Sequence, residues 1–195
     1  MKIALIRHGM TEGNIRKQYS GVTNDKLCPE GIEELKRLAG ERPIQPDIVF
    51  ASPMSRCLDT AEILFPNREP VIIDELAEMN FGIFEGRAFA GDLENDPVYR
   101  KWIEGGCEDT IPEGENKTEF AKRCAAGFMK ALAMIPDEQA DEDYLAAFAV
   151  HGGTIMAVMA IFADSDKEYY DWLAANGRGY MGEWNGRRIT DIREI

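Results

Sequence analysis

The sequence has little positive charge for its length. It has 195 residues, in which 22 lysines and arginines stand against 35 aspartates and glutamates, and the formal net charge is −13. Nucleic acids and anionic membranes are bound by basic surfaces. We therefore expect neither a nucleic acid nor a membrane as partner. On net charge alone, a small anionic ligand is disfavoured as well.

Long apolar runs and paired cysteines are also missing. The apolar run that precedes Arg7 is far too short for a signal peptide or a membrane span. The four cysteines form no Cys-x-x-Cys pair, so neither a zinc cluster nor a redox pair is indicated. Few cysteines and no export signal are typical of a cytoplasmic protein with reduced thiols.

The length predicts one domain over residues 1–195, at about 150 residues per domain, and the hydrophobic share of 45% suffices for a core. Short apolar runs predict strands at residues 3–7, 47–51, 70–73 and 144–150. Helical periodicity predicts helices at 29–40, from a Ser52 cap and Pro53 onward, at 117–135, at 154–162 and near 167–175. This alternation predicts an α/β fold, a three-layer α/β/α arrangement with a mostly parallel central sheet.

Two segments depart from this alternation. Glycines and prolines break the pattern over residues 86–115, which we expect to form a cap excursion over the core with one helix around Val98–Ile103. Near the C-terminus, Trp184-Asn185-Gly186-Arg187 is typical of a two-residue hairpin turn that would place Glu183 opposite Arg188. This hairpin would add antiparallel strands at the edge of the sheet.

Reactive or charged side chains follow four of the predicted strands. Arg7 and His8 end the first, Arg56 follows the second, Glu78 follows the third and His151 ends the fourth. In open α/β sheets, ligands bind outside the carboxyl ends of the strands. We therefore expect these five side chains to meet at one edge of the sheet. Each of these side chains, taken alone, also fits a structural role, such as that of a histidine at a strand end or an arginine on the surface.

These residue types suit phosphoryl transfer. The planar guanidinium of arginine matches phosphate oxygens and stays charged. A neutral histidine nitrogen is a nucleophile near pH 7, and a buried carboxylic acid can protonate a leaving alkoxide. Glycine follows both histidines, His8 and His151, where the missing Cβ would let the backbone approach a ligand. Helix starts at Ser52 and Gly152 would add backbone N–H donors.

The motifs resemble those of a known family. Arg7-His8-Gly9-Met10-Thr11-Glu12-Gly13-Asn14 is similar to the opening pattern Arg-His-Gly-x-Thr-x-x-Asn of the histidine phosphatase superfamily, in the branch shared with cofactor-dependent phosphoglycerate mutase. Further segments that resemble this branch, in the same order, are Ser52–Ala61, Leu76–Gly86, Gly114–Asn116 with Arg123, and Val150–Ile155. Together the motifs cover nearly the whole chain.

The resemblance implies a role for each matching position. His8 would be the nucleophile that becomes phosphohistidine, and Glu78 would protonate the leaving group and then deprotonate the attacking water. The groups expected to contact the phosphoryl group or substrate are Arg7, Arg56, His151, Asn14 and Gly152. The resemblance implies no metal and no cofactor, and residues 86–115 would shape substrate choice.

The resemblance leaves the exact reaction open. A phosphomonoesterase acting on a sugar or nucleoside-like phosphate is expected, because the arginine that follows the acid in mutases is missing after Glu78. The run from Glu78 to Arg87 is similar to short phosphatases of the α-ribazole phosphatase type. The alternatives are a phosphoglycerate mutase-type phosphotransferase and a non-catalytic phospholigand-binding module.

The predicted cap segment is acidic, and this bears on the substrate. Its acidic side chains are Asp92, Glu94, Asp96, Glu104, Glu108, Asp109 and Glu113. They predict a small-molecule phosphomonoester with one phosphate and a neutral or cationic remainder. No heptad pattern indicates an oligomeric state.

Overall fold

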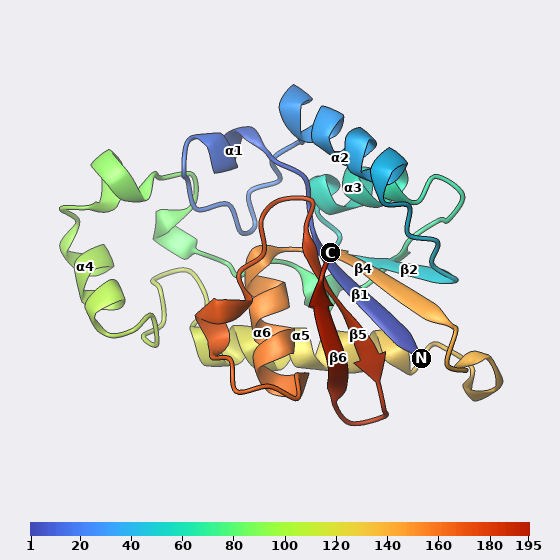
Figure 1. The fold of residues 1–195 in the computed structure, drawn as a ribbon. Coiled ribbons are helices and arrows are strands. Elements are labelled where there is room, and N and C mark those ends of the chain that lie inside the picture. Colours follow the sequence, from blue (N-terminus) through green and yellow to red (C-terminus); the bar gives the residue numbers. More distant parts are fainter.

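The computed structural model describes the backbone of residues 1–195 and every side chain except that of Asp137. Its centre is a six-stranded sheet in the order β3-β2-β4-β1-β5-β6 (Figure 1). The strands are β1 (Lys2–Arg7), β2 (Ile48–Ala51), β3 (Val71–Ile72), β4 (Leu145–Val150), β5 (Gly179–Trp184) and β6 (Ile189–Glu194). β1 to β4 are parallel, whereas β5 is antiparallel to β1 and β6 to β5. The predicted, mostly parallel sheet is confirmed.

Helices cover both faces of this sheet. In Figure 1, α2 (Pro29–Glu41) and α3 (Ser55–Leu64) lie above it, and α5 (Lys117–Leu132) and α6 (Gly152–Phe162) lie below. The remaining elements are α1 (Glu12–Ile15), η1 (Asp74–Leu76), η2 (Gly82–Phe84), η3 (Phe89–Leu93), α4 (Pro97–Glu104), η4 (Asp137–Gln139) and η5 (Tyr169–Trp172). The three-layer α/β/α arrangement is confirmed.

The central strands are apolar on both faces because both faces are covered. In β1, Ile3 and Leu5 join the hydrophobic cluster that contains residues of α5 and α6. The alternate residues Ala4 and Ile6 join the smaller cluster on the side of α3. Successive side chains of a strand point to opposite faces, so a continuous apolar run is what a doubly covered strand requires.

The helix that follows β2 begins later than predicted. It starts at Ser55, with Met54 as its N-cap, so the Ser52 cap is wrong. The hydroxyl of Ser52 instead lies 2.7 Å from Nε2 of His151. The backbone N–H of Ser55 donates to Oδ1 of Asn24 at 2.8 Å. A side chain from a distant loop therefore replaces the local cap.

The helix predicted near 167–175 is a single short turn, η5. Glu168 and Asp171 form a reciprocal capping box around it, and Leu173 returns to extended backbone. The turn ends there, and the chain continues toward β5 along the carboxyl ends of the parallel strands.

β5 and β6 form the expected hairpin at the sheet edge, but in another register. Glu183 pairs with Thr190, so its predicted position opposite Arg188 is wrong. The N–H of Asn185 donates to the carbonyl of Arg188 at 3.1 Å, and Oδ1 of Asn185 accepts the backbone N–H groups of Arg187 and Arg188, at 3.0 and 2.8 Å. An Asx turn therefore closes this hairpin.

Residues 86–115 extend away from the sheet, at the left of Figure 1. The predicted helix is present as α4, which begins after Asp96, whose side chain accepts the N–H groups of Val98 and Tyr99. Leu93 and Trp102 are buried and belong to the same cluster as Ile3 and Leu5 of β1. The segment is therefore anchored by its own apolar residues.

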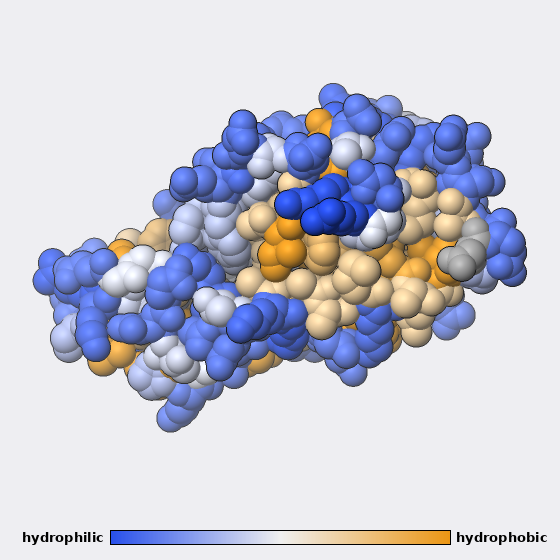
Figure 2. Space-filling view, turned by 90° about the horizontal axis from the view of Figure 1, so that it is seen from below, coloured by the Kyte–Doolittle hydropathy of each residue, from blue (hydrophilic) through white to orange (hydrophobic). Residues whose placement is uncertain are grey.

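The surface is mainly polar, but one face carries an apolar area (Figure 2). Figure 2 shows this face from below, with an apolar area over α5 and α6. Exposed apolar residues of these helices are Met129 and Ile161, and the exposed Met134 lies just beyond the end of α5. None of the described helices is long and apolar enough to cross a membrane.

Candidate active site

A cavity of about 630 Å³ lies at the carboxyl ends of the parallel strands. It is lined by five of the predicted residues, which are Arg7, His8, Asn14, Glu78 and Gly152. The other two, Arg56 and His151, are fully buried and lie behind this lining. The ring of His151 is 5.3 Å from that of His8, centroid to centroid, in an edge-to-face arrangement. The fold thus brings all seven to one end of the sheet.

His8 is oriented by the backbone of the residue that follows it. Its Nδ1 lies 2.7 Å from the carbonyl oxygen of Gly9. A carbonyl can only accept, so Nδ1 carries the proton and Nε2 keeps its lone pair. Burial, together with the charge of Arg56, lowers the pKa of His8 from 6.5 to about 3. His8 is therefore a neutral imidazole at neutral pH.

Gly9 has a packing reason that differs from the predicted approach to a ligand. A Cβ at Gly9 would lie 2.6 Å from a methyl carbon of Leu35 in α2. The missing side chain therefore lets α2 pack closely against the chain that follows β1.

His151 is held on both ring nitrogens. Nε of Arg56 donates to Nδ1 at 3.3 Å, so Nε2 carries the proton toward Oγ of Ser52, at 2.7 Å. Burial and the charge of Arg56 lower the pKa of His151 well below 6.5. The buried sulfur of Cys57 lies 3.4 Å from Nε2. Ser52 and Cys57 thus contact this ring, and the only sequence signal for them is their place in the Ser52–Ala61 motif.

The two arginines differ in how many partners they have. Arg56 donates to the carbonyl groups of Ser20, Gly21 and Thr23 at 2.8–3.0 Å. Arg7 donates through Nη1 to the carbonyl of Ala174 at 2.8 Å. Its buried Nε has no partner among the described residues. Arg7 therefore keeps donor capacity beside the cavity, whereas Arg56 mainly braces the loop at residues 20–23.

That loop is held from its other side by Glu85, which sequence reasoning did not single out. Its carboxylate accepts the backbone N–H groups of Gly21, Val22 and Thr23 at 3.1–3.2 Å. It also accepts the N–H of Phe81 at 3.0 Å. Glu85 therefore ties the loop to the chain segment that carries Glu78.

Glu78 accepts two backbone hydrogen bonds. Met79 N–H donates to Oε1 and Gly153 N–H to Oε2, both at 3.0 Å. Burial raises the pKa of Glu78 above its ordinary 4.5, although these hydrogen bonds and the two arginines oppose the rise. A Cβ at position 153 would lie 2.2 Å from Oε1. The glycine there lets the carboxyl group sit against the start of α6.

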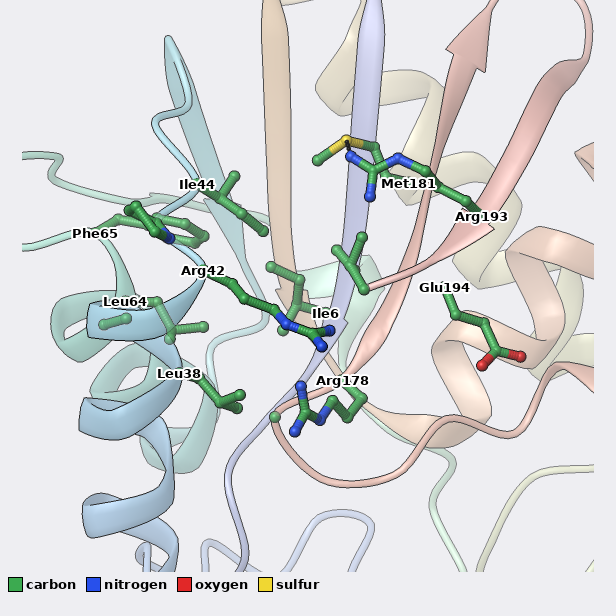
Figure 3. Close-up of a pocket in the computed structure, with 14 residues that line it drawn as sticks. Ile6, Leu38, Arg42, Ile44, Leu64, Phe65, Arg178, Met181, Arg193 and Glu194 are labelled. Atoms are coloured by element: carbon green, nitrogen blue, oxygen red, sulfur yellow. Dashed lines mark hydrogen bonds between the residues drawn. The ribbon is translucent and has the colours of Figure 1, made fainter.

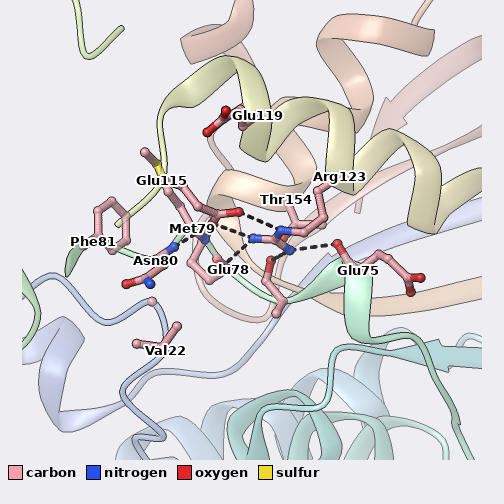
Figure 4. A network of polar contacts seen from close by, with 12 residues as sticks. Val22, Glu75, Glu78, Met79, Asn80, Phe81, Glu115, Glu119, Arg123 and Thr154 are labelled. Atoms are coloured by element: carbon pink, nitrogen blue, oxygen red, sulfur yellow. Dashed lines mark hydrogen bonds and ion pairs between the residues drawn. The ribbon is translucent and has the colours of Figure 1, made fainter. Parts of the chain in front are cut away.

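An ion pair holds the backbone around Glu78 (Figure 4). Nη1 of Arg123 donates to the carbonyl groups of Glu75 and Ala77, both at 2.9 Å, and Nη2 donates to that of Glu78 at 3.2 Å. The same guanidinium binds Glu115 through Nε and Nη2, at 2.8 and 2.7 Å. Arg123 therefore fixes three carbonyl groups of the loop on which Glu78 sits.

A second cavity, of about 370 Å³, lies between α2 and the β5–β6 edge (Figure 3). Its walls are mainly apolar, and Arg42, Arg178 and Arg193 surround them. It contains neither histidine and only one carboxylate side chain, Glu194. Of these two cavities, the first combines a histidine with an acid. Among the described residues no group of histidine, cysteine, aspartate and glutamate side chains could hold a metal ion.

Comparison with known proteins fits this geometry. The family model of the histidine phosphatase superfamily (branch 1) matches residues 3–191. The chain is 34% identical over 127 residues to adenosylcobalamin/alpha-ribazole phosphatase of Escherichia coli, 63% of either protein. It is 32% identical over 139 residues to probable phosphoglycerate mutase GpmB of Proteus mirabilis, which is 69% of this chain and 64% of that protein.

Solved structures agree with the fold. A structure from Escherichia coli K-12 is 25% identical and superimposes with a TM-score of 0.82 over 100% of this chain and 95% of that one. The crystal structure of phosphoglycerate mutase from Thermus thermophilus is 27% identical, with a TM-score of 0.71 over 100% and 99% of the two chains.

Proposed function

Because this chain belongs to the histidine phosphatase superfamily, we propose that it is a phosphomonoesterase that forms a phosphohistidine on His8. The observation that carries the proposal is the neutral His8, whose Nδ1 is tied to Gly9 so that Nε2 is free to attack. Glu78, with its raised pKa, lines the same cavity. A nucleophile and an acid therefore face one space.

The first step transfers the phosphoryl group to the enzyme. The lone pair on Nε2 of His8 attacks phosphorus, and the ester P–O bond breaks. The protonated carboxyl of Glu78 gives its proton to the departing oxygen, so the alcohol leaves neutral. A carboxyl group can serve as this acid near neutral pH only if its pKa is raised, and burial raises that of Glu78.

The second step releases phosphate. The Glu78 carboxylate takes a proton from water, whose oxygen attacks phosphorus while the P–N bond to His8 breaks. Glu78 is then protonated and His8 neutral, as at the start. Each step therefore leaves the enzyme ready for the next.

Positive charge close to phosphorus would stabilise both transition states. We assign this role to Arg7 and Arg56, with His151 and Asn14 as further polar contacts. The N–H of Gly152 is a further donor, because the first N–H groups of α6 have no partner inside the helix. The free Nε of Arg7 supports this assignment.

The proposal also covers the substrate, the partners and the location of the protein. We propose a small-molecule phosphomonoester as substrate, with no nucleic acid or membrane partner, and a cytoplasmic location. The net charge of −13 and the four free thiols support this.

The decisive experiment is hydrolysis of p-nitrophenyl phosphate together with trapping of the phosphoenzyme. We expect release of phosphate and a trapped adduct that is labile in acid and stable in base, as a phosphoramidate is. His8→Ala should lose both. An acid-stable adduct contradicts phosphohistidine. Binding of phosphate without any turnover would favour the non-catalytic module, and transfer to phosphoglycerate faster than to water would favour the mutase.

The guanidinium groups supply the charge in this mechanism, so we expect no metal requirement. Phosphate release should persist at its full rate after dialysis against EDTA. A loss that Mg²⁺ or Zn²⁺ restores would show that the assignment of charge stabilisation to Arg7 and Arg56 is incomplete.

A further inference from the structure

Exposed apolar side chains gather around the candidate active site. Phe89, Ile103, Tyr170 and Leu173 are each more than 40% exposed and all line the cavity at the carboxyl ends of the strands. Large apolar side chains left in water at one concave place mark a surface that a ligand covers. The rim of this cavity is therefore built for an apolar group.

Aromatic rings form the wall inside that rim. Tyr19 lies at the centre of this wall, with ring centroids 4.7 Å from Phe81, 6.1 Å from Trp102 and 6.3 Å from Phe89. Its hydroxyl is hydrogen bonded to that of Tyr99 at 3.0 Å. The polar end of Tyr19 is thus satisfied by the protein, and its ring offers apolar contact to the cavity.

Charge is nearly absent from the part of the cavity away from His8. The lining residues include one carboxylate, Glu78, and two cations, Arg7 and Lys117. Lys117 forms an ion pair with Glu108, and its ammonium group lies 5.6 Å from the ring centroids of Tyr169 and Tyr170. Its charge is already neutralised, so it leaves little attraction for a carboxylate.

The acidic residues of 86–115 do not line this cavity either. Asp96 caps α4 and pairs with Arg87 at 2.9 Å, and Glu108 pairs with Lys117. Because these acids lie outside the lining, they give no reason to expect a cationic remainder, and a neutral remainder stays a prediction. The segment instead contributes Phe89, Trp102 and Ile103 to the lining, so it favours an apolar substrate rather than a cationic one.

We propose that the alcohol part of the substrate carries an aromatic ring and no carboxylate. This inference rests on the proposed phosphatase function. With the phosphoryl group at His8, the ring would lie against Tyr19 and under Phe89. Burying such a ring is worth about a 10- to 100-fold gain in kcat/KM over a small alkyl group. Substrates of the phosphoglycerate or phosphoserine kind carry a carboxylate, and the one lining cation besides Arg7 is Lys117, which is already paired with Glu108.

Three synthetic phosphates of primary alcohols test the substrate class. They are ethyl phosphate, 2-phenylethyl phosphate and the para-carboxylated form of the latter. We expect kcat/KM for 2-phenylethyl phosphate to exceed that for ethyl phosphate at least tenfold. The carboxylated ring should lose most of that gain, because it brings an unpaired charge into an aromatic wall.

Phe89→Ala tests the wall itself. The ratio of kcat/KM for 2-phenylethyl phosphate to that for ethyl phosphate should fall about tenfold. Met134→Ala is the control, since Met134 is also apolar and exposed, 52% against 43% for Phe89, but lies just beyond the end of α5 and outside the cavity lining. It should leave the ratio as in the wild type.

Glu108→Gln tests the charge argument in the opposite direction. Removing the carboxylate frees Lys117, so the variant should turn over the carboxylated substrate severalfold faster than the wild type does. The ratio of kcat/KM for 2-phenylethyl phosphate to that for its carboxylated form should therefore be smaller in the variant than in the wild type. Equal kcat/KM for ethyl and 2-phenylethyl phosphate overturns the inference but leaves the phosphatase proposal standing. Failure to hydrolyse any substrate, p-nitrophenyl phosphate included, removes the phosphatase proposal first.

Discussion

At the scale of single residues, the candidate site depends on protonation states that burial sets. His8 and His151 are kept neutral because burial and the charge of Arg56 lower the pKa of both rings. Glu78 has the opposite shift, since burial raises the pKa of a carboxyl group. One environment thus favours a neutral nucleophile and a protonated acid at the same time, which is the pairing that phosphoryl transfer to histidine needs.

Glu78→Gln separates proton donation from nucleophilic attack. An alkyl phosphate needs a proton on its leaving oxygen, whereas p-nitrophenolate leaves readily without one. We expect kcat for an alkyl phosphate to fall about 10²- to 10⁴-fold, as for loss of a general acid. Formation of the phosphoenzyme from p-nitrophenyl phosphate should slow much less. Equal losses on both substrates would remove Glu78 from the role of acid.

The pH dependence follows from the same two shifts. Attack requires neutral His8, which is available above about pH 3. Proton donation requires protonated Glu78, so kcat/KM for an alkyl phosphate should fall as pH rises through a pKa above 4.5. Rate profiles of the wild type and Glu78→Gln check this. A descending limb that persists in the variant must come from another group.

At the scale of elements, the loop after β3 is held by partners from α5 and from the chain before it. Arg123 of α5 donates to the carbonyl groups of Glu75, Ala77 and Glu78, and Glu115 accepts the N–H of Asn80 at 2.9 Å. The side chain of Glu78 is then fixed by the start of α6. Two helices thus position a carboxyl group that belongs to an irregular loop.

Arg123→Lys should disturb this loop while keeping its charge. A lysine cannot bind Glu115 with a fork and donate to three carbonyl groups at once. We expect kcat on alkyl phosphates to fall about 10- to 100-fold, by analogy with a displaced catalytic group, and p-nitrophenyl phosphate to be affected less. Lys122→Met, on an exposed neighbour in α5, is the control. A uniform loss on both substrates would indicate a role in folding alone.

At the scale of the whole molecule, net charge and local charge have to be separated. The chain carries −13 overall, yet Arg7 and Arg56 lie together at one end of the sheet. Charges on the exposed surface are screened beyond about 8–10 Å, whereas buried charges are screened much less. A protein with a net negative charge can therefore still bind a phosphate in a buried site. The acids on its surface disfavour only nucleic acids and anionic membranes as partners.

The whole molecule should also lose stability in mild acid. The chain has two histidines, and both are buried with lowered pKa values. Below pH 6.5 the unfolded chain binds protons that the folded chain refuses, so unfolding is favoured by up to about 1.4 kcal/mol per histidine per pH unit. The raised pKa of Glu78 opposes this loss of stability, but one carboxyl group offsets only part of the effect of two histidines.

Urea unfolding at pH 7, 6 and 5 checks this prediction. The free energy of unfolding of the wild type should decrease as the pH is lowered from 7 to 5. His8→Asn, which removes one of the two groups, should show a shallower fall. The same slope in both proteins would mean that the histidines are not the cause.

Sequence alone determined the layered α/β fold, the order of its strands and helices along the chain, and the residues that meet at the strand ends. It could do so because periodicity reports which faces are buried, and because parallel strands all end at one edge. The family motifs narrowed the chemistry further. These features depend on residues that are neighbours along the chain or recur at a fixed spacing.

Only the tertiary structure decided which partners distant residues have. Ser52 bonds to His151 rather than capping α3, Arg123 holds the loop of Glu78, and aromatic rings line the cavity where the acids of residues 86–115 do not. A hydrogen bond or a ring contact between residues 50 or 100 positions apart leaves no periodic trace in a sequence. It forms because packing brings the two groups together, and the substrate preference proposed here follows from that packing.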